Sequence, residues 1–329
     1  MAGDRDLAVA FVTAWSAGRD RRLSGWEVAA ATGVRGLRLL NETVAFERMR
    51  LTEANDEAAR VLARNAVAWP GATATQQDGR TPPSGGPFDY VDVDPYGTPA
   101  PFVPAAFAAV RSGGVLAVTA TDMMVLAGVQ KGACERRYGA RPVRGRLGPE
   151  GGLRILIAYL AREARRRERA VRPLLAYARD HYVRAFLEVK LGADGPAVDP
   201  VETLVPESWA GPTLGERGPY GPLWVGPLFD GPTVRGLRVP PSAARPAETS
   251  RFIDRLKEET GADCPFYYES NRLSSQLGLR SPPGLARLLD GLRARGFRAA
   301  RTHARPEGFR TDAPRETVES TARSLSETG

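Results

Sequence analysis

The first half of the sequence alternates short apolar runs with longer amphipathic ones, and this alternation constrains the fold most. Strands are predicted at 26–31, 49–53, 72–77, 88–94 and 115–121, and helices at 37–48, 56–68 and 101–111. A glycine turn at Ser112-Gly113-Gly114 should end the third of these helices. Such alternation is typical of a parallel sheet with crossover helices. A longer helix at 152–169 and a strand at 181–190 follow, so the sequence predicts an α/β domain.

Acidic or glycine-bearing turns follow four of these strands. In an open parallel sheet, ligands bind beyond the carboxyl ends of the strands. Gly33 should bring the backbone close to a ligand, and Glu53 is placed to hold ribose hydroxyls. Asp78 is placed to accept a hydrogen bond from an adenine amine. The four turns are Thr32-Gly33-Val34-Arg35-Gly36, Glu53, Asp78-Gly79 and Asp94. Together they indicate a site for a nucleoside cofactor.

The fourth strand ends in Asp94-Pro95-Tyr96. The Asp94 carboxylate and a free carbonyl can accept hydrogen bonds from an exocyclic amine, while the Tyr96 ring can stack on a flat base. The same residues also suit a simple Asp-Pro turn without a ligand. A glycine turn followed by an acid also describes dinucleotide dehydrogenases. However, the turn at Gly33 is not GxGxxG, and Asp94-Pro95-Tyr96 favours S-adenosylmethionine over NAD.

The composition shifts after residue 190. Residues 191–247 are rich in Gly and Pro, and then helices are predicted at 249–260 and 283–295, with strands at 265–269 and 298–303. This pattern predicts a smaller α+β domain over 191–314, after a cofactor-binding domain over 1–190. The polar tail 315–329 is predicted to be disordered.

The net charge of +8 favours a polyanionic partner such as nucleic acid. The helix predicted at 152–169 ends in an arginine run that could contact phosphates, or could simply be a solvated helix end. We find no run that could span a bilayer and no secretory signal. The two cysteines form no CxxC pair, so no metal site is predicted and a cytosolic enzyme is expected.

Several colinear segments resemble the tRNA (guanine-26-N2)-dimethyltransferases of archaea and eukaryotes. They cover nearly the whole chain in the family's order. The matching segments are AATGVRGLR (30–38), DPYGTPAPF (94–102), VTATDMMVLAG (118–128), RRYGARP (136–142), EGGLRILIAYLAREA (150–164), RPLLAYARDHYVRAFLEV (172–189), GPLWVGPLFD (221–230) and RTHARPEGFRTDAP (301–314). The resemblance implies a class I, Rossmann-like, S-adenosylmethionine-dependent methyltransferase domain with a smaller α+β C-terminal domain that binds tRNA.

The resemblance also implies roles for single residues. Asp94 would be the catalytic carboxylate, with Pro95 beside it and Tyr96 stacking on guanine, where the family more often has Phe. The implied cofactor-binding residues are Arg5, Gly33, Arg35, Glu53, Asp78 and Gly79. The residues expected to bind tRNA are Arg165, Arg166 and Arg169 of the arginine run and His303, Arg310, Thr311 and Asp312 of the terminal signature. A cytoplasmic monomer is expected.

Two departures from the family leave alternatives open. The family carries a Phe/Tyr-Asn-Pro motif before an Asn-Arg-Asp, whereas this sequence begins almost directly before Arg5. Many members also carry a four-cysteine zinc site, but residues 200–220 contain no cysteine. One alternative is therefore a catalytically impaired RNA-binding paralogue. Another is an amine methyltransferase that acts on a different nucleic acid.

Overall fold

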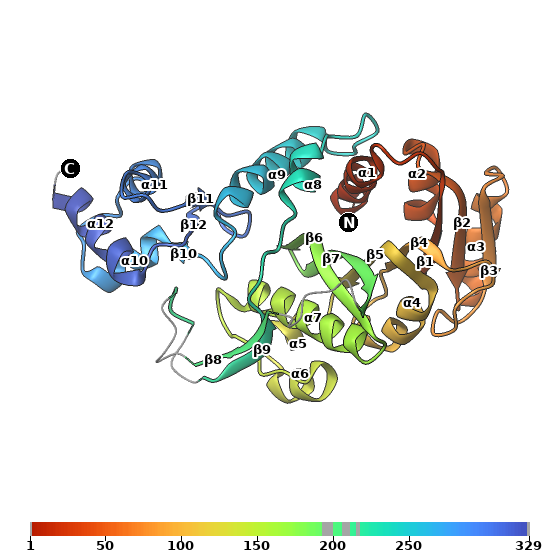
Figure 1. Cartoon of the computed structure of the whole chain (residues 1–329), viewed down its shortest axis with the longest axis horizontal. Coiled ribbons are helices and arrows are strands. Elements are labelled where there is room, and N and C mark those ends of the chain that lie inside the picture. The colour runs from red at the N-terminus through yellow and green to blue at the C-terminus, as the bar shows by residue number, and fades with distance from the viewer. Residues whose placement is uncertain (1, 193–199, 206–210, 215–217, 328–329) are drawn as a thin grey trace.

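A seven-stranded sheet forms the centre of the molecule. The computed structural model describes residues 2–192, 200–205, 211–214 and 218–327. Within these ranges the strand order is β3-β2-β1-β4-β5-β7-β6 (Figure 1). The strands are β1 Leu23–Val28, β2 Phe46–Glu53, β3 Ala72–Gln76, β4 Phe88–Val93, β5 Val110–Ala120, β6 Arg169–Arg179 and β7 Tyr182–Leu191. β1 to β5 pair in parallel, whereas β7 is antiparallel to both β5 and β6.

Helices cover both faces of this sheet. The helical segments of the first half are α1 Ala2–Ser16, α2 Val34–Glu42, α3 Asp56–Ala66, η1 Ala100–Phe102, α4 Val103–Ala109, α5 Met123–Leu126, α6 Lys131–Tyr138 and α7 Gly148–Arg165. In Figure 1, α1 and α2 lie on one side of the sheet and α4 and α7 on the other. The strand order reverses between β1 and β4, and this switch point is where open α/β sheets bind their ligands.

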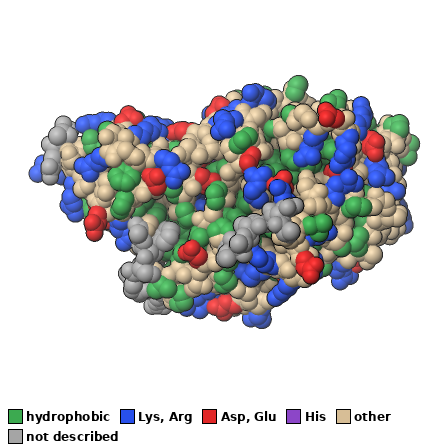
Figure 2. Space-filling model, in the orientation of Figure 1, with side chains coloured by type: hydrophobic (Ala, Val, Ile, Leu, Met, Phe, Trp, Pro, Cys, Tyr) green, Lys and Arg blue, Asp and Glu red, His purple; other side chains and the backbone are tan. Residues whose placement is uncertain are grey.

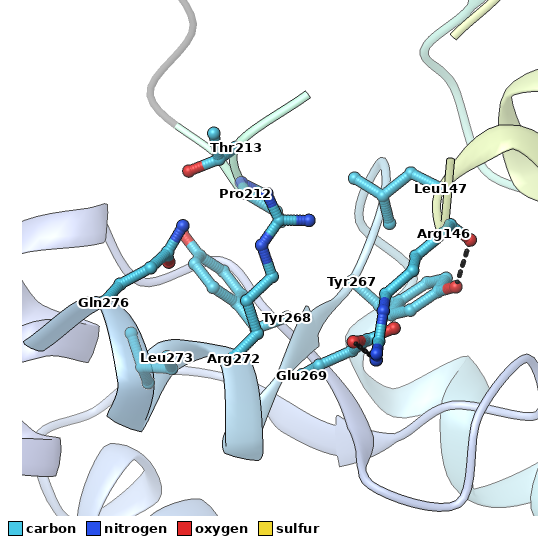
Figure 3. Close-up of a pocket in the computed structure, with 10 residues that line it drawn as sticks. All are labelled: Arg146, Leu147, Pro212, Thr213, Tyr267, Tyr268, Glu269, Arg272, Leu273 and Gln276. Carbon is cyan, nitrogen blue, oxygen red and sulfur yellow. Dashed lines mark hydrogen bonds and ion pairs between the residues drawn. The ribbon is translucent and has the colours of Figure 1, made fainter. Parts of the chain in front are cut away.

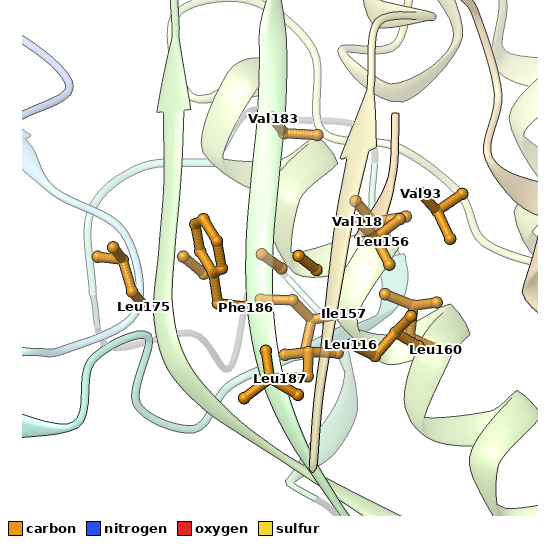
Figure 4. Close-up of a cluster of buried hydrophobic side chains, with 14 of the residues drawn as sticks. Val93, Leu116, Val118, Leu156, Ile157, Leu160, Leu175, Val183, Phe186 and Leu187 are labelled. Carbon is orange, nitrogen blue, oxygen red and sulfur yellow. The ribbon is translucent and has the colours of Figure 1, made fainter. Parts of the chain in front are cut away.

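An apolar stripe along α7 packs this helix against the sheet. Leu156, Ile157 and Leu160 lie on one face of α7 and are fully buried against Leu116 of β5 and Leu187 of β7 (Figure 4). Their spacing of one, three and four residues makes one apolar stripe. The helix thereby seals the sheet face opposite α1.

The second half adds a hairpin, two helices on the main core, and a separate C-terminal unit. Its elements are β8 Val201–Leu204, β9 Tyr220–Trp224, α8 Gly231–Gly236, α9 Pro246–Glu259, η3 Thr260–Ala262, β10 Tyr268–Glu269, α10 Ser270–Leu277, α11 Leu285–Ala294, β11 Ala299–Arg301, β12 Gly308–Thr311 and α12 Arg315–Glu327. The main hydrophobic core extends through Tyr267, and a second core joins residues from Tyr268 to Ala322. We call residues 268–327 the C-terminal unit.

The α/β class and the first five strands agree with the sequence prediction, but three local predictions are wrong. Residues 315–327 are not disordered, because Val318 and Ala322 of α12 are fully buried in the second core. The helix predicted at 152–169 ends at Arg165, and β6 begins at Arg169. The turn at Gly113 lies inside β5, where Gly113 has a φ of 76° and the register with β4 shifts.

Candidate active site at the carboxyl edge of the sheet

Asp94, Pro95 and Tyr96 leave β4 at the switch point and border an open cavity of about 150 Å³. The cavity is also lined by the turn after β1 and by Arg5, Glu27, Arg35 and Thr121. Asp94 is 11% exposed, whereas Tyr96 is 99% exposed. Gly97 holds the loop: its N–H donates to Thr121 Oγ1 at 2.7 Å, and its carbonyl accepts from the Thr121 N–H at 2.9 Å. The structure therefore presents a buried carboxylate beside an exposed ring.

A buried group of three aspartates and two arginines positions Asp94. Arg35 donates to Asp4 at 2.6 Å and to Asp92 at 3.2 Å, and it also pairs with Asp94. Arg184 pairs with Asp92 at 2.6 Å and lies 3.6 Å from Asp4. We call these five residues the aspartate–arginine network. With all five ionised, it carries one excess negative charge.

The network and its burial affect the proton affinity of Asp94. Burial raises the pKa of Asp94, the Arg35 guanidinium opposes the rise, and the Asp4 and Asp92 carboxylates add to it. Asp94 Oδ1 is buried and has no hydrogen-bond partner among the described residues. A buried carboxylate oxygen without a donor is costly, so this atom is suited to accept a hydrogen bond from a ligand.

Glu27 is a site residue that the sequence reasoning missed. It lies in β1, is 5% exposed and lines the cavity, and its Oε2 accepts from the Gly36 N–H at 2.9 Å. Burial raises its pKa from 4.5 to about 8, although Arg35 opposes the rise. The signal in the sequence was an acid within an otherwise buried strand, LSGWEV.

We expect Glu27→Gln to stabilise the protein increasingly as the pH rises. Between pH 4.5 and about 8 the folded protein keeps the Glu27 proton, whereas the unfolded chain releases it. Stability from this group is thus present below pH 4.5 and lost as the pH rises, by up to about 1.4 kcal/mol per pH unit. From pH 6 to pH 8 the variant should gain about 2–3 kcal/mol relative to wild type in urea unfolding without ligand. An unchanged difference at both pH values would contradict this.

Some of the predicted cofactor residues line the cavity, and others lie behind its lining. Arg5 and Arg35 line it, although the Arg35 guanidinium is directed to the aspartate–arginine network. Gly33 starts α2 with a φ of 77°, and a Cβ at this position would lie 2.5 Å from Leu62. Glu53 accepts from the backbone N–H of Ala31, which lines the cavity, at 2.8 Å.

Asp78 and Gly79 lie after β3 and do not line the cavity. Asp78 pairs with Arg80 at 2.5 Å, and this hydrogen bond lowers the pKa of the Asp78 carboxyl. Gly79 is buried, and a Cβ there would lie 2.4 Å from Val28 at the end of β1. The contact with β1 explains the requirement for glycine at residue 79. The adenine contact of Asp78 stays a prediction.

The arginine run lies at the opposite edge of the sheet from Asp94. Arg169 begins β6 and donates to the carbonyl of Val110, the first residue of β5, at 2.6 Å. Both strands start there, so Arg165, Arg166 and Arg169 flank the amino edge. Arg166 is 72% exposed and pairs with Glu163. A phosphate contact at this edge could not position a base at Asp94.

The terminal signature is mostly buried, so the prediction that it contacts tRNA is wrong for Arg310 and Thr311. The contact of His303 stays a prediction, because His303 also lines a surface hollow. The Arg310 side chain is 0% exposed and pairs with Glu150 at 2.8 Å and with Glu259. The His303 side chain is 2% exposed and lies 2.6 Å from Glu259. Thr311 is buried in β12. Polar residues in a motif can join elements as well as bind ligands, and here they join the C-terminal unit to α7 and α9.

Asp312 is partly exposed and pairs with Arg298 at 2.8 Å. Its carboxylate is negatively charged and does not attract an RNA phosphate. Within the described residues, no cluster of three His, Cys, Asp or Glu side chains is placed to hold a metal ion. Among the described helices, none has the length and apolar character that crossing a bilayer requires.

Comparisons with known proteins agree on one family. The family model described as N2,N2-dimethylguanosine tRNA methyltransferase matches residues 1–200 and 213–323. The tRNA (guanine(26)-N(2))-dimethyltransferase of Thermococcus kodakarensis is 36% identical over 88% of this chain and 83% of its own length. That of Pyrobaculum arsenaticum is 35% identical over 97% and 88%. A solved complex of Trm1 from Pyrococcus horikoshii with S-adenosyl-L-methionine has a TM-score of 0.82 and 28% identity, covering 98% of this chain and 92% of that chain.

Proposed function

The chain belongs to the N2,N2-dimethylguanosine tRNA methyltransferase family, and from this premise we propose that it transfers one or two methyl groups from S-adenosylmethionine to N2 of guanine 26 in tRNA. The observation that carries the proposal is the free buried oxygen of Asp94 at the switch-point cavity, beside an exposed aromatic ring. The carboxylate oxygen suits an amine that donates a hydrogen bond, and the ring suits a flat base.

The residues around the cavity fit S-adenosylmethionine. The aspartate–arginine network has one excess negative charge, and Glu27 adds a further carboxyl that becomes anionic once a cation lies beside it. These charges complement a sulfonium and an ammonium group. The turn at Gly33 allows close backbone approach. When bound there, the cofactor supplies an electrophilic methyl group.

Asp94 acts on the guanine amine. The N2 lone pair is delocalised into the ring, so N2 must be aimed at the methyl carbon. Asp94 Oδ1 accepts one N2–H, which orients the amine and stabilises the positive charge that develops on N2. Arg35 and the Thr121–Gly97 hydrogen bonds hold the carboxylate and its loop in place. The proton on N2 becomes acidic only after methylation, so Asp94 need not be a strong base.

Tyr96 receives the base after it leaves the RNA stack. Extruding a nucleotide costs a few kcal/mol, and a ring that is 99% exposed can replace the lost stacking. In this proposal residues 1–190 hold the cofactor, and the rest of the chain contributes to tRNA binding. We further propose that the chain acts in the cytoplasm as a monomer.

We expect Tyr96→Ala to raise the KM for tRNA by about 5- to 150-fold, since stacking of one base on an aromatic ring contributes about 1–3 kcal/mol. Tyr96→Phe keeps the ring and should stay within about twofold of wild type. Because the side chain is 99% exposed, neither change should alter the melting temperature. Equal KM values for the Ala and Phe variants would exclude stacking as the role of Tyr96.

One assay tests the whole proposal against its alternatives. The protein is incubated with labelled S-adenosylmethionine and a tRNA transcript that carries G or A at position 26, and the nucleosides are then analysed. Label in N2-methylated guanosine from the G transcript only supports the proposal. Equal labelling of both transcripts contradicts it and favours another nucleic-acid amine. RNA binding without label would indicate a catalytically impaired relative.

A further inference from the structure

Two hollows outside the catalytic cavity lie where the C-terminal unit meets the carboxyl edge of the sheet. The first, about 360 Å³, is lined by the tip of the β6–β7 hairpin, by Pro149 at the start of α7, and by Arg179, Tyr267 and Arg305. β6 is parallel to β4, so its Arg179 end lies at the same edge as Asp94. This hollow is therefore a neighbour of the catalytic cavity.

The second hollow adjoins the first at Tyr267, which lines both. Figure 3 shows Arg146 on one side, with Glu269 beside it, and Arg272 rising from α10 toward Thr213. The Tyr267 hydroxyl donates to the Arg146 carbonyl at 2.9 Å. The two hollows thus share one aromatic wall, and we call them together the arginine groove.

The groove connects to the catalytic cavity through the first turn of α1. Gly3 lies against Arg179, since a Cβ on Gly3 would be 3.1 Å from Arg179 Nη1. Two residues further along this turn, Arg5 lines the catalytic cavity. A polyanion entering the cavity would therefore meet Arg5 and Arg179 before it reached the C-terminal unit.

The arginines of the groove keep hydrogen-bonding capacity for an anion. Arg179 pairs with Glu248, but its Nη1 is buried and has no partner among the described residues. Arg272 and Arg305 are exposed, and neither has a carboxylate within ion-pair distance in the part of the chain that the structure describes. Two acids line the groove: Glu269 pairs with Arg146 at 2.5 Å, and Asp180 lies 3.8 Å from Arg179, so four arginines face two lining carboxylates. The groove is therefore net positive.

We propose that the arginine groove binds the sugar-phosphate backbone of the tRNA beside the extruded nucleotide; this inference rests on the proposed function. Guanidinium forks suit phosphate oxygens, and Tyr267 supplies a flat wall between the two arginine pairs. The placement also explains how the C-terminal unit contributes, although its signature arginine Arg310 is buried. The positive side chains of this unit, which are all arginines, extend the positive surface (Figure 2).

The test compares two double variants that remove the same charge. Arg272→Gln/Arg305→Gln changes the groove, whereas Arg60→Gln/Arg166→Gln changes arginines that are 75% and 72% exposed, on α3 and directly after α7. We expect the groove variant to bind a tRNA transcript about tenfold more weakly at 0.1 M salt. Its slope of log K against log salt should fall by about 1.5, because each phosphate contact contributes about 0.7–0.9. KM for tRNA should rise while kcat and S-adenosylmethionine affinity stay unchanged.

The outcomes separate this inference from the proposed function. Arg272→Lys/Arg305→Lys should restore most of the salt slope, and a lysine variant as weak as the glutamine one would overturn a charge-based contact. Wild-type affinity in the groove variant, or an equal loss in the Arg60/Arg166 variant, would overturn the groove. Absence of methyl transfer by the wild-type protein would refute the proposed function, while the binding comparison still decides on the groove.

Discussion

Asp94→Asn is expected to lower kcat for methyl transfer by at least about 10³-fold, the upper range for removing one preorganised hydrogen-bonding group. The amide has nearly the same shape as the carboxylate, so the variant should still fold around Arg35. It has no negative charge, however, and cannot stabilise the positive charge that develops on guanine N2. Single-turnover transfer from labelled S-adenosylmethionine to tRNA measures the effect.

The matched control is Asp89→Asn, on the same strand but at the opposite edge of the sheet. Asp89 is also buried, and it pairs with Arg21 and with Arg111 at 3.1 Å. This control should lose stability yet keep kcat at a temperature where it is folded. S-adenosylmethionine affinity, measured by calorimetry, should change only a few-fold in the Asp94 variant. A rate within tenfold of wild type for Asp94→Asn would remove Asp94 from the reaction.

The second large effect is expected on stability: Arg310→Ala should lower the free energy of unfolding by about 3–5 kcal/mol. Arg310 donates to Glu150 at 2.8 and 3.0 Å and to the carbonyls of Cys264 and Phe266 at 2.7 and 2.9 Å. It also pairs with Glu259. Truncation removes the cation that the buried carboxylates of Glu150 and Glu259 share, so urea unfolding should show the loss directly.

Arg298→Ala serves as the control, because this arginine is 60% exposed and, among the described residues, has Asp312 as its one ion-pair partner. An exposed pair contributes about 0–1 kcal/mol. If Arg310 instead contacted tRNA, Arg310→Ala would keep its stability and lose affinity for RNA. That result would restore the role implied by the sequence motif and contradict the buried position.

The position of the Asp94 loop at a strand end was predictable from the sequence because its signal is local. An acid and a proline after an apolar run mark a strand end, and Asp94 lies there in the structure. Asp4 and Arg184 were not recognised, although both are buried in the network behind Asp94. They are separated from Asp94 by about a quarter of the chain or more, and no spacing rule joins such residues.

The sequence by itself determined the α/β class, the order of the first strands, and the loop that carries Asp94 and Tyr96, because hydrophobic periodicity and turn residues act over short distances. Only the tertiary structure decided which charges are available to a ligand. It buries Arg310 between two acids, places Arg166 at the far edge, and leaves Arg305 beside the site. The physical reason is that solvent exposure and ion pairing depend on which elements pack together. In the sequence, a buried arginine cannot be told from an exposed one.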